Sequence, residues 1–499
     1  MFQNDLRILV ILIAWVMVCS SVYLSGQKNL PAALDTDAHS SLDSLFGTAQ
    51  IIYLGEQSHR DGATFDAKRS LVEYLHERHG FTVLAFEGDA FALDHWNTAL
   101  QTDRAEKAGL HAALMPFWSW NTAVDSLAGY LIEQEGHLQV AGFDNQLTTQ
   151  LSLDSFTVTL RQLLPMTTSV DFVLLDELVS RLLRMDSFTE GDAADAAGIR
   201  TSAVVELENR PLTPDRRIFW AMLLESLVQE ISYSAAAAAG RPEAVQNARD
   251  RQMAKNLVYL TRQYPGQKII CWGASYHFAK DLSSLQLRDT TTQRYLRNMN
   301  DLMGHDSLAL NDLLELKEAV PMAQVFAELS TLPTLSLAFA AGTGYTDQGH
   351  FGEDTLHFPV PSAPPGSWEE QFINQGDGES IHVFSETDTV ARHLAVFGYL
   401  PIRANWSASF DAVYFTPTMY PAVYLPASET EPVDTFNSLP IDTLSGRVID
   451  ARTKQPVAYA YVYSSPDEDP LLTNLSGFFR GPGTGDSISI TAIGYATLR

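Results

Sequence analysis

Four apolar runs of this chain each lead into an acidic residue or a histidine. Three of them end at Glu56, Glu87 and Asp144, and the fourth starts at Lys268 and is followed by His277. Continuous apolar runs of this length indicate strands that are buried on both faces, as in a parallel sheet. The carboxyl ends of parallel strands face one crevice, so we expect these side chains to converge although they lie far apart in the chain.

A helix between the first two strands supports the parallel arrangement. Its inward-facing positions recur three and four residues apart, at Lys68, Leu71, Val72 and Leu75, and Gly80 is a typical helix stop. The next strand follows at once, which gives a strand, helix, strand unit with a right-handed crossover. We therefore predict an α/β fold with a mostly parallel sheet and flanking helices.

The main folded domain is predicted to span residues 46–425. Within it, the apolar period is helical over about residues 150–264, which indicates an inserted helical lobe. A polar stretch reaches to about Ser44 before the first strand. The segment from Gly342 to Gly378 is rich in Gly, Pro and acids, and we predict a long loop there.

The two ends of the chain differ in character from this domain. Residues 1–26, with Arg7 before the apolar run Ile8–Val18, resemble a secretory signal, and an uncleaved anchor is the second choice. Residues 426–443 have a linker composition, and the short, mostly alternating runs of residues 444–499 indicate a small β-sandwich. We expect an exported protein, in the periplasm, the cell envelope or the medium, with any membrane association made by the N-terminal segment.

Charge and cysteine content narrow the partners further. The chain has 33 basic and 60 acidic residues and a net charge of −27, which disfavours contact with nucleic acid. Of its two cysteines, Cys19 lies in the signal-like segment, so removal of that segment would leave Cys271 unpaired. We interpret Cys271 as a small buried hydrophobe.

The first strand leads into a loop that carries Glu56 and His59. A carboxylate that fixes one ring nitrogen of a histidine leaves the other free to act as a general base, which contributes roughly 10² to 10⁴ in rate. An exposed pair without function would be the simpler reading for this loop alone. The equivalent positions of Glu87, Asp144 and His277 favour a hydrolytic site.

Two further side chains complete the set of catalytic candidates. Lys68 lies on the inward face of its helix, where a cation needs a partner, and we expect it to pair with Glu87 or to stabilise an oxyanion. His277 follows the fourth strand and is expected to assist leaving-group protonation. The nearby Ser275 lacks the second glycine of a nucleophile elbow and is not assigned as a nucleophile.

Two alternatives stay open. Glu56, His59, Glu87 and His277 could instead bind a metal ion, although their spacing is not the helical two-histidine signature. We favour a site without metal or other cofactor. In the second alternative, the chain is a cell-envelope binding protein with no catalytic activity.

At these residues the chain resembles the erythromycin esterase family, from about Gln50 to Thr416. The resemblance rests on Gly55-Glu56-x-x-His59, Phe86-Glu87, Gly142-Phe143-Asp144, Arg249-Asp250-x-x-Met253 and the strand to His277. It implies an α/β core with a helical lobe and ester hydrolysis by water without a covalent acyl-enzyme.

The resemblance also implies roles for single residues. His59 is its base, Glu56 and Glu87 orient that base, and His277 matches a second histidine. Two positions depart from the family pattern: Lys68 stands in place of an arginine, and Ala274 in place of a histidine. Lysine lacks the planar guanidinium group with which arginine binds two acceptor atoms at once. We therefore expect an ester or lactone substrate and do not predict that macrolides are cleaved. The side chains expected to contact the substrate are Trp118, Asp144 and Arg249.

The tail has its own resemblance, to the carboxypeptidase regulatory-like β-sandwich of exported bacterial proteins. It rests on Ser445-Gly446-x-Val448-Ile449-Asp450, Pro456-Val457-x-Tyr459-Ala460-x-Val462 and Ile493-Gly494-Tyr495. It implies a packing or attachment role without catalytic residues.

Overall fold

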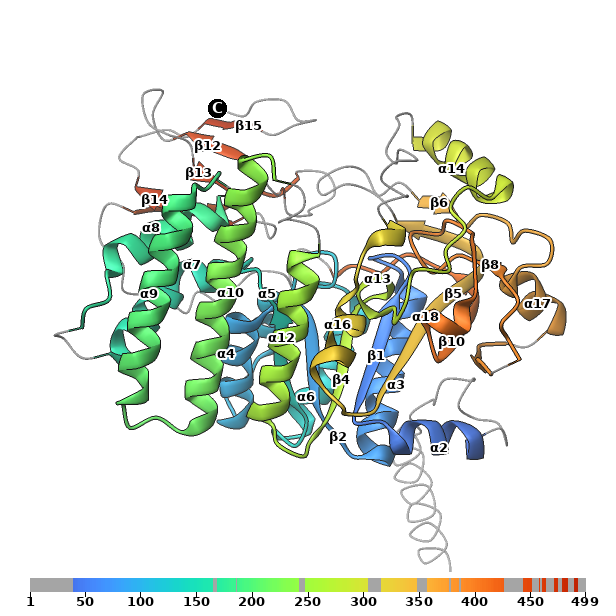
Figure 1. The fold of residues 1–499 in the computed structure, drawn as a ribbon, viewed down its shortest axis with the longest axis horizontal. Helices are drawn as coiled ribbons and strands as arrows, with labels where there is room; N and C mark the ends of the chain where they lie inside the picture. The colour runs from blue at the N-terminus through green and yellow to red at the C-terminus, as the bar shows by residue number, and fades with distance from the viewer. Residues whose placement is uncertain are drawn as a thin grey trace, which may run out of the picture.

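The computed structural model describes most of the chain between residues 39 and 491 (Figure 1). The described residues are 39–164, 168–184, 186–241, 247–303, 316–347, 357–376, 378–385, 387–425, 443–450, 457, 460–463, 471–473, 478–482 and 489–491. The predicted signal of residues 1–26 and most of the predicted linker therefore lie outside the described residues.

An eight-stranded sheet forms the centre of the molecule. Its order is β3 (Gln139–Asp144), β2 (Phe81–Asp89), β4 (Lys268–Ala274), β1 (Ile51–Glu56), β5 (Thr334–Asp347), β10 (Ala412–Met419) and β7 (Ser380–Val383), and β6 (His357–Pro359) pairs with β5. The strands from β3 to β10 are parallel, and β6 and β7 are antiparallel to their neighbours. The predicted fold class, a mostly parallel α/β sheet, is confirmed.

Alternate residues of the central strands enter two separate cores. Tyr53 of β1 and Cys271 of β4 face one core, and their neighbours Leu54 and Trp272 face the other. This follows from the two-residue period of a strand, and because both faces are covered, both sets are apolar. Cys271 is buried and unpaired, as expected.

The first face is covered by the helical lobe, which Figure 1 shows in green at one side of the sheet. All described elements between β3 and β4 are helices: α7 (Gln150–Leu163), α8 (Phe172–Leu183), α9 (Glu190–Glu208), α10 (Pro214–Ala238) and α12 (Ala248–Gln263). The helix α16 (Met322–Leu329) joins them on that face.

The opposite face is covered by helices from the first third of the chain. They are α2 (His39–Thr48), α3 (Gly62–His79), α4 (Ala90–Gln101), α5 (Lys107–Ala113) and α6 (Thr122–Glu133). Helix α3 ends at Gly80, which takes the left-handed conformation (φ 69°) expected of a helix stop. Asp89 caps α4 by accepting from two backbone N–H groups of its first turn.

One prediction of irregular chain is wrong, and one helix was not predicted. The polar stretch before the first strand contains α2, and the segment predicted as a long loop from Gly342 to Gly378 contains the end of β5, β6 and α17 (Trp368–Gln375). Gly344 shows why composition misled: β5 remains paired with β10, and a Cβ at Gly344 would lie 2.0 Å from the carbonyl oxygen of Met419. Glycine is thus required at this position of the strand by close packing, although glycine in a sequence usually indicates a loop.

The remaining elements all follow β4 along the chain, from the short helix directly after it to the tail. They are α13 (Ser275–Phe278), α14 (Thr290–Met303), β8 (Arg392–Leu394), β9 (Ile402–Ala404), α18 (Trp406–Ser409), β11 (Thr443–Arg447), β12 (Tyr461–Tyr463), β13 (Leu471–Leu472), β14 (Phe478–Pro482) and β15 (Ser489–Thr491). The tail strands form a two-stranded and a three-stranded sheet, so a C-terminal β region is present as predicted. Of the helices described, none has the length and apolar character needed to cross a bilayer.

Candidate functional site

His59 and Glu56 form a hydrogen-bonded pair at the carboxyl end of β1. Nδ1 of His59 lies 2.7 Å from Oε1 of Glu56, whose carboxylate is fully buried, whereas the His59 side chain is 43% exposed. Phe117 stacks on the imidazole ring at 4.1 Å between centroids. Because a carboxylate only accepts hydrogen bonds, Nδ1 carries a proton, and in the neutral form of the imidazole the lone pair is then on Nε2.

Two more donors converge on the same carboxylate. Nζ of Lys68 donates to Oε2 of Glu56 at 2.6 Å, and Nε1 of Trp118 donates to Oε1 at 2.5 Å. The expected pairing of Lys68 with Glu87 is therefore wrong, because the nearer strand end supplies the partner. The Lys68 ammonium is buried, and its second bond goes to the carbonyl oxygen of Gly273 at 2.9 Å, so it is not turned toward a substrate.

His277 lies between two carboxylates at the ends of β2 and α12. Nδ1 of His277 is 2.7 Å from Oδ1 of Asp250, and Nε2 is 3.2 Å from Oε1 of Glu87. Burial alone would lower the pKa of His277, but the two carboxylates raise it to about 10. The two carboxylates thus favour the protonated form of His277, although Nη1 of Arg249 also lies 3.2 Å from Nε2. The contact with Glu87 means that Glu87 orients His277 and not His59.

Arg249 joins the ends of β2 and β3. Its Nη2 donates to Oδ2 of Asp144 at 2.7 Å and to Oε1 of Glu87 at 2.8 Å, and Nε donates to Oδ1 of Asp144 at 3.2 Å. Burial would raise the pKa of Glu87, but His277 and Arg249 hold it well below its usual range. The Arg249 side chain is 30% exposed, and its Nη1 also lies 3.2 Å from Nε2 of His277.

The three residues expected to contact a substrate differ in their access to solvent. Trp118 and Asp144 are buried, with their polar atoms bonded to Glu56 and Arg249. Their positions suit side chains that hold the site together. Arg249 alone among the three is open to a bound molecule.

Backbone groups of β4 connect the two clusters. Gly273 accepts from Lys68 of the first cluster, and the N–H of Ala274 donates to Oε2 of Glu87 in the second at 3.0 Å. A Cβ at Gly273 would lie 2.7 Å from Oε2 of Glu87, so only glycine allows this approach. All five predicted catalytic side chains are therefore placed around one strand end.

Asp250 was not assigned from the sequence. An acid in the first turn of a helix is usually explained by the helix dipole, which conceals any other role. Its place directly after Arg249 was a usable signal, since both residues lie in the first turn of α12, and that turn meets the strand ends.

The described residues give little support to a metal centre. Among them, no three or more His, Cys, Asp or Glu side chains are grouped in a way that could hold a metal ion. The carboxylates of the site are instead paired with the cations Lys68, Arg249 and His277. These residues do not fit a catalytic metal set of histidines and carboxylates.

The protein is therefore an α/β protein with an enzyme-like site. Buried carboxylates, histidines and cations lie together at the ends of its parallel strands. The chain belongs to the erythromycin esterase family, because the sequence profile of that family, described as erythromycin esterase, matches residues 76–419. This range includes Glu87, Asp144, Arg249 and His277. It begins after Glu56, His59 and Lys68, so the interpretation of these three residues rests on their geometry.

Individual proteins agree with this assignment. YbfO of Bacillus subtilis, whose name describes it as a hydrolase, is 26% identical over 415 residues, which cover 75% of this chain and 85% of YbfO. Hydrolase activity is therefore supported at the level of the family and of this relative.

Solved structures share the fold. A mutant of the erythromycin esterase EreC in its open conformation superposes with a TM-score of 0.58 at 19% identity, over 78% of this chain and 95% of that one. A Bacillus cereus protein gives a TM-score of 0.58 at 14% identity, over 80% of this chain and 96% of that one. A succinoglycan biosynthesis protein gives 0.57 at 14%, over 79% and 94%.

Proposed function

We propose that this protein hydrolyses an ester or lactone of a small molecule, with His59 as the general base that activates water. The observation that carries this proposal is the contact between Nδ1 of His59 and the buried Glu56, in which the His59 side chain is 43% exposed and Nε2 is the second ring nitrogen. A base whose tautomer is fixed and whose second nitrogen is free can take a proton from water as the water attacks a carbonyl carbon.

The second cluster supplies charge to the same reaction. A tetrahedral intermediate carries a developing negative charge on the carbonyl oxygen, and we assign Arg249, whose side chain is 30% exposed, to offset it. His277, with its pKa raised to about 10, contributes positive charge next to Glu87 and releases its proton reluctantly. We therefore assign His277 an electrostatic role in place of the proton transfer expected from the sequence. The proton that Nε2 of His59 takes from water then passes to the leaving alkoxide oxygen as the C–O bond breaks.

Lys68 and Glu87 act through other groups in this scheme. Lys68 neutralises Glu56 and fixes its orientation through a bond of 2.6 Å. Glu87 keeps His277 charged and holds Arg249 in place. Both are positioning residues.

The test is hydrolysis of a panel of lactones and simple esters by the wild type and by His59→Ala. We expect the wild type to cleave at least one ester, without a burst of product because no acyl-enzyme forms, and His59→Ala to lose roughly 10² to 10⁴ in kcat. Equal turnover by the two proteins, above the uncatalysed rate, would contradict the proposal. Loss of activity on prolonged treatment with a chelator would favour a metal-dependent hydrolase instead.

Export is part of the proposal and is supported by the sequence of residues 1–26 alone. Fractionation of cells that produce the full chain tests it, with N-terminal sequencing of the product. A protein that stays in the cytoplasm with residues 1–26 intact would contradict export and leave the proposed reaction unaffected.

A further inference from the structure

One tyrosine hydroxyl binds the residues on both sides of the proposed base. The hydroxyl of Tyr399 donates to Oδ2 of Asp61 at 2.6 Å and accepts from Nε2 of Gln57 at 3.0 Å. Gln57 and Asp61 lie two residues before and two residues after His59. A single buried oxygen therefore closes the base of the loop that presents the imidazole ring.

The backbone around Tyr399 reinforces this contact. The N–H of Gly398 donates to the carbonyl oxygen of Gln57 at 2.7 Å, and Thr346 donates to the other carboxylate oxygen of Asp61 at 2.7 Å. Asp61 is thus held by two hydroxyl groups from segments that lie more than 280 residues further along the chain. Nearer in the chain, Nε2 of Gln57 also lies 3.2 Å from the hydroxyl of Thr64, so the distant segments add to a local contact.

Tyr399 occupies a backbone conformation that its side chain does not favour. Gly398 and Tyr399 have φ angles of 58° and 61°, and the N–H of Leu400 donates to the carbonyl oxygen of Phe397 across them at 3.2 Å. Two left-handed residues with this bond form a tight turn in which glycine or asparagine would be the less strained choice for the second position. Such strain persists where surrounding contacts hold it in place and is frequent at functional sites.

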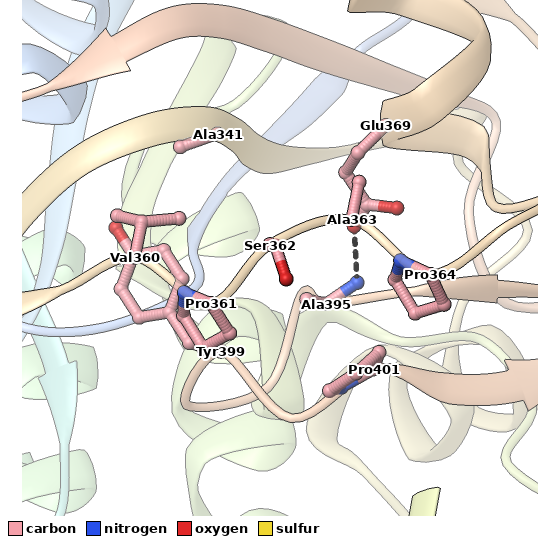
Figure 2. Close-up of a pocket in the computed structure, with 10 residues that line it drawn as sticks. All are labelled: Ala341, Val360, Pro361, Ser362, Ala363, Pro364, Glu369, Ala395, Tyr399 and Pro401. Atoms are coloured by element: carbon pink, nitrogen blue, oxygen red, sulfur yellow. Dashed lines mark hydrogen bonds between the residues drawn. The ribbon is translucent and has the colours of Figure 1, made fainter. Parts of the chain in front are cut away.

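The phenol ring is also confined. Figure 2 shows Tyr399 on the wall of a small pocket that is also lined by Val360, Ser362 and Glu369. The pocket has a volume of about 10 Å³, which is close to the space of a single water molecule and far too small for a ring to move into. On the side of the loop, the ring packs against Ala63 and Met419.

We infer that Tyr399 is a positioning residue for His59: through Gln57 and Asp61 its hydroxyl sets the loop so that Nδ1 of His59 meets Glu56. This inference rests on the proposed function for its catalytic consequence, but the geometric part stands without it.

The test uses full-length protein and four variants: Tyr399→Phe, His59→Ala, the double variant, and Tyr414→Phe as a matched control. Tyr414 is also buried, and its hydroxyl donates to the carboxylate of Glu379 at 3.0 Å. It lies on β10, and in the sheet order β10 and β2 are on opposite sides of β1. The two phenylalanine variants thus delete the same kind of bond at different places.

We expect Tyr399→Phe to lower kcat about 10- to 100-fold with KM changed less than about twofold, because a misplaced base affects the chemical step more than binding. Tyr414→Phe should keep kcat within about twofold. In the His59→Ala background, Tyr399→Phe should have no further effect on the residual rate. Equal kcat for Tyr399→Phe and Tyr414→Phe, or full additivity with His59→Ala, would overturn the inference.

A second readout separates this inference from the proposed function. In histidine-labelled protein, the ring nitrogen shifts of His59, assigned with His59→Ala, should show a single tautomer with the proton on Nδ1 in the wild type and in Tyr414→Phe, and a mixture in Tyr399→Phe. If no ester is cleaved, the proposed function fails while this measurement still decides the role of Tyr399. An unchanged tautomer in Tyr399→Phe would overturn it.

Discussion

Nδ1 of His59 lies 2.7 Å from Oε1 of Glu56, in a contact between an exposed imidazole and a fully buried carboxylate. Because Glu56 also accepts from Lys68 and Trp118, its orientation does not depend on His59. The Glu56 carboxylate is therefore fixed in place, and it determines which tautomer His59 adopts and how the imidazole ring is oriented. This relationship leads to the first prediction.

Glu56→Gln should reduce kcat by roughly 10² to 10⁴, because an amide presents one acceptor oxygen to three donors and its NH₂ group opposes one of them. The rate of ester hydrolysis measures this effect. Glu73→Gln is the control, since Glu73 forms a partly exposed pair with Arg69 on the same helix as Lys68. Loss of activity in the control comparable to that of Glu56→Gln would show that general damage to α3 is responsible.

Lys68→Met should lower the free energy of unfolding by about 3–5 kcal/mol, because it leaves the buried carboxylate of Glu56 without its cation. Lys68→Met combined with Glu56→Gln should be more stable than Lys68→Met alone, since the uncompensated charge is gone. Urea denaturation of the wild type and the three variants completes the cycle. A double variant whose stability is the sum of the single effects would mean that the pair is not coupled.

His277 should make the protein lose stability as the pH rises. Its folded pKa is raised to about 10 from an ordinary 6.5, so its contribution is complete below 6.5 and is lost as the pH approaches and passes 10. Burial also raises the pKa of Asp61, from an ordinary 3.8 to about 8. The stability contributed by its protonated form is therefore lost as the pH rises from 3.8 to about 8 and does not change further above that pH. Between pH 8 and 10 the buried thiol of Cys271, whose pKa is raised, also contributes to the decline. The difference between the wild type and His277→Gln therefore isolates His277, and His277→Gln should flatten the decline in this window. An equal slope for both proteins would refute the assigned imidazolium.

Gly273→Ala should disrupt both clusters, because the new Cβ would lie 2.7 Å from Oε2 of Glu87 and 2.9 Å from the ring of Phe278. We expect a loss of about 1–3 kcal/mol in the free energy of unfolding from overpacking, together with a lower kcat as Glu87 moves away from Ala274. Gly198→Ala in α9 is the control, since no atom lies within 4 Å of its added Cβ. It should stabilise the protein by up to about 1 kcal/mol. Equal stability and kcat for the two variants would contradict the close approach.

Much of the fold was readable from local pattern. The runs around Tyr53 and Cys271 are apolar at every position because each strand is covered on both faces, and the structure confirms the parallel sheet that this implies. Composition was a poorer guide where glycine served a packing need, as at Gly344 inside β5. The helix α2 was missed because its sequence is largely polar and its apolar side chains are few.

The sequence predicted where the site lies but not which of its residues contact one another. Strand ends marked Glu56, Glu87, Asp144 and the segment before His277, because parallel strands deliver their carboxyl ends to one edge whatever their order. The partners depended on that order. β4 inserts between β2 and β1, so its backbone reaches both Lys68 and Glu87.

The sequence by itself determined the periodic features: which segments are strands or helices, which faces are apolar, and which polar residues stand at strand ends. Those properties depend on neighbours within a few positions, and the chain records them locally. Only the tertiary structure decided that Lys68 binds Glu56, that Asp250 binds His277, and that Tyr399 closes the His59 loop. Each of these contacts joins segments whose meeting follows from strand order and packing, which no local pattern specifies.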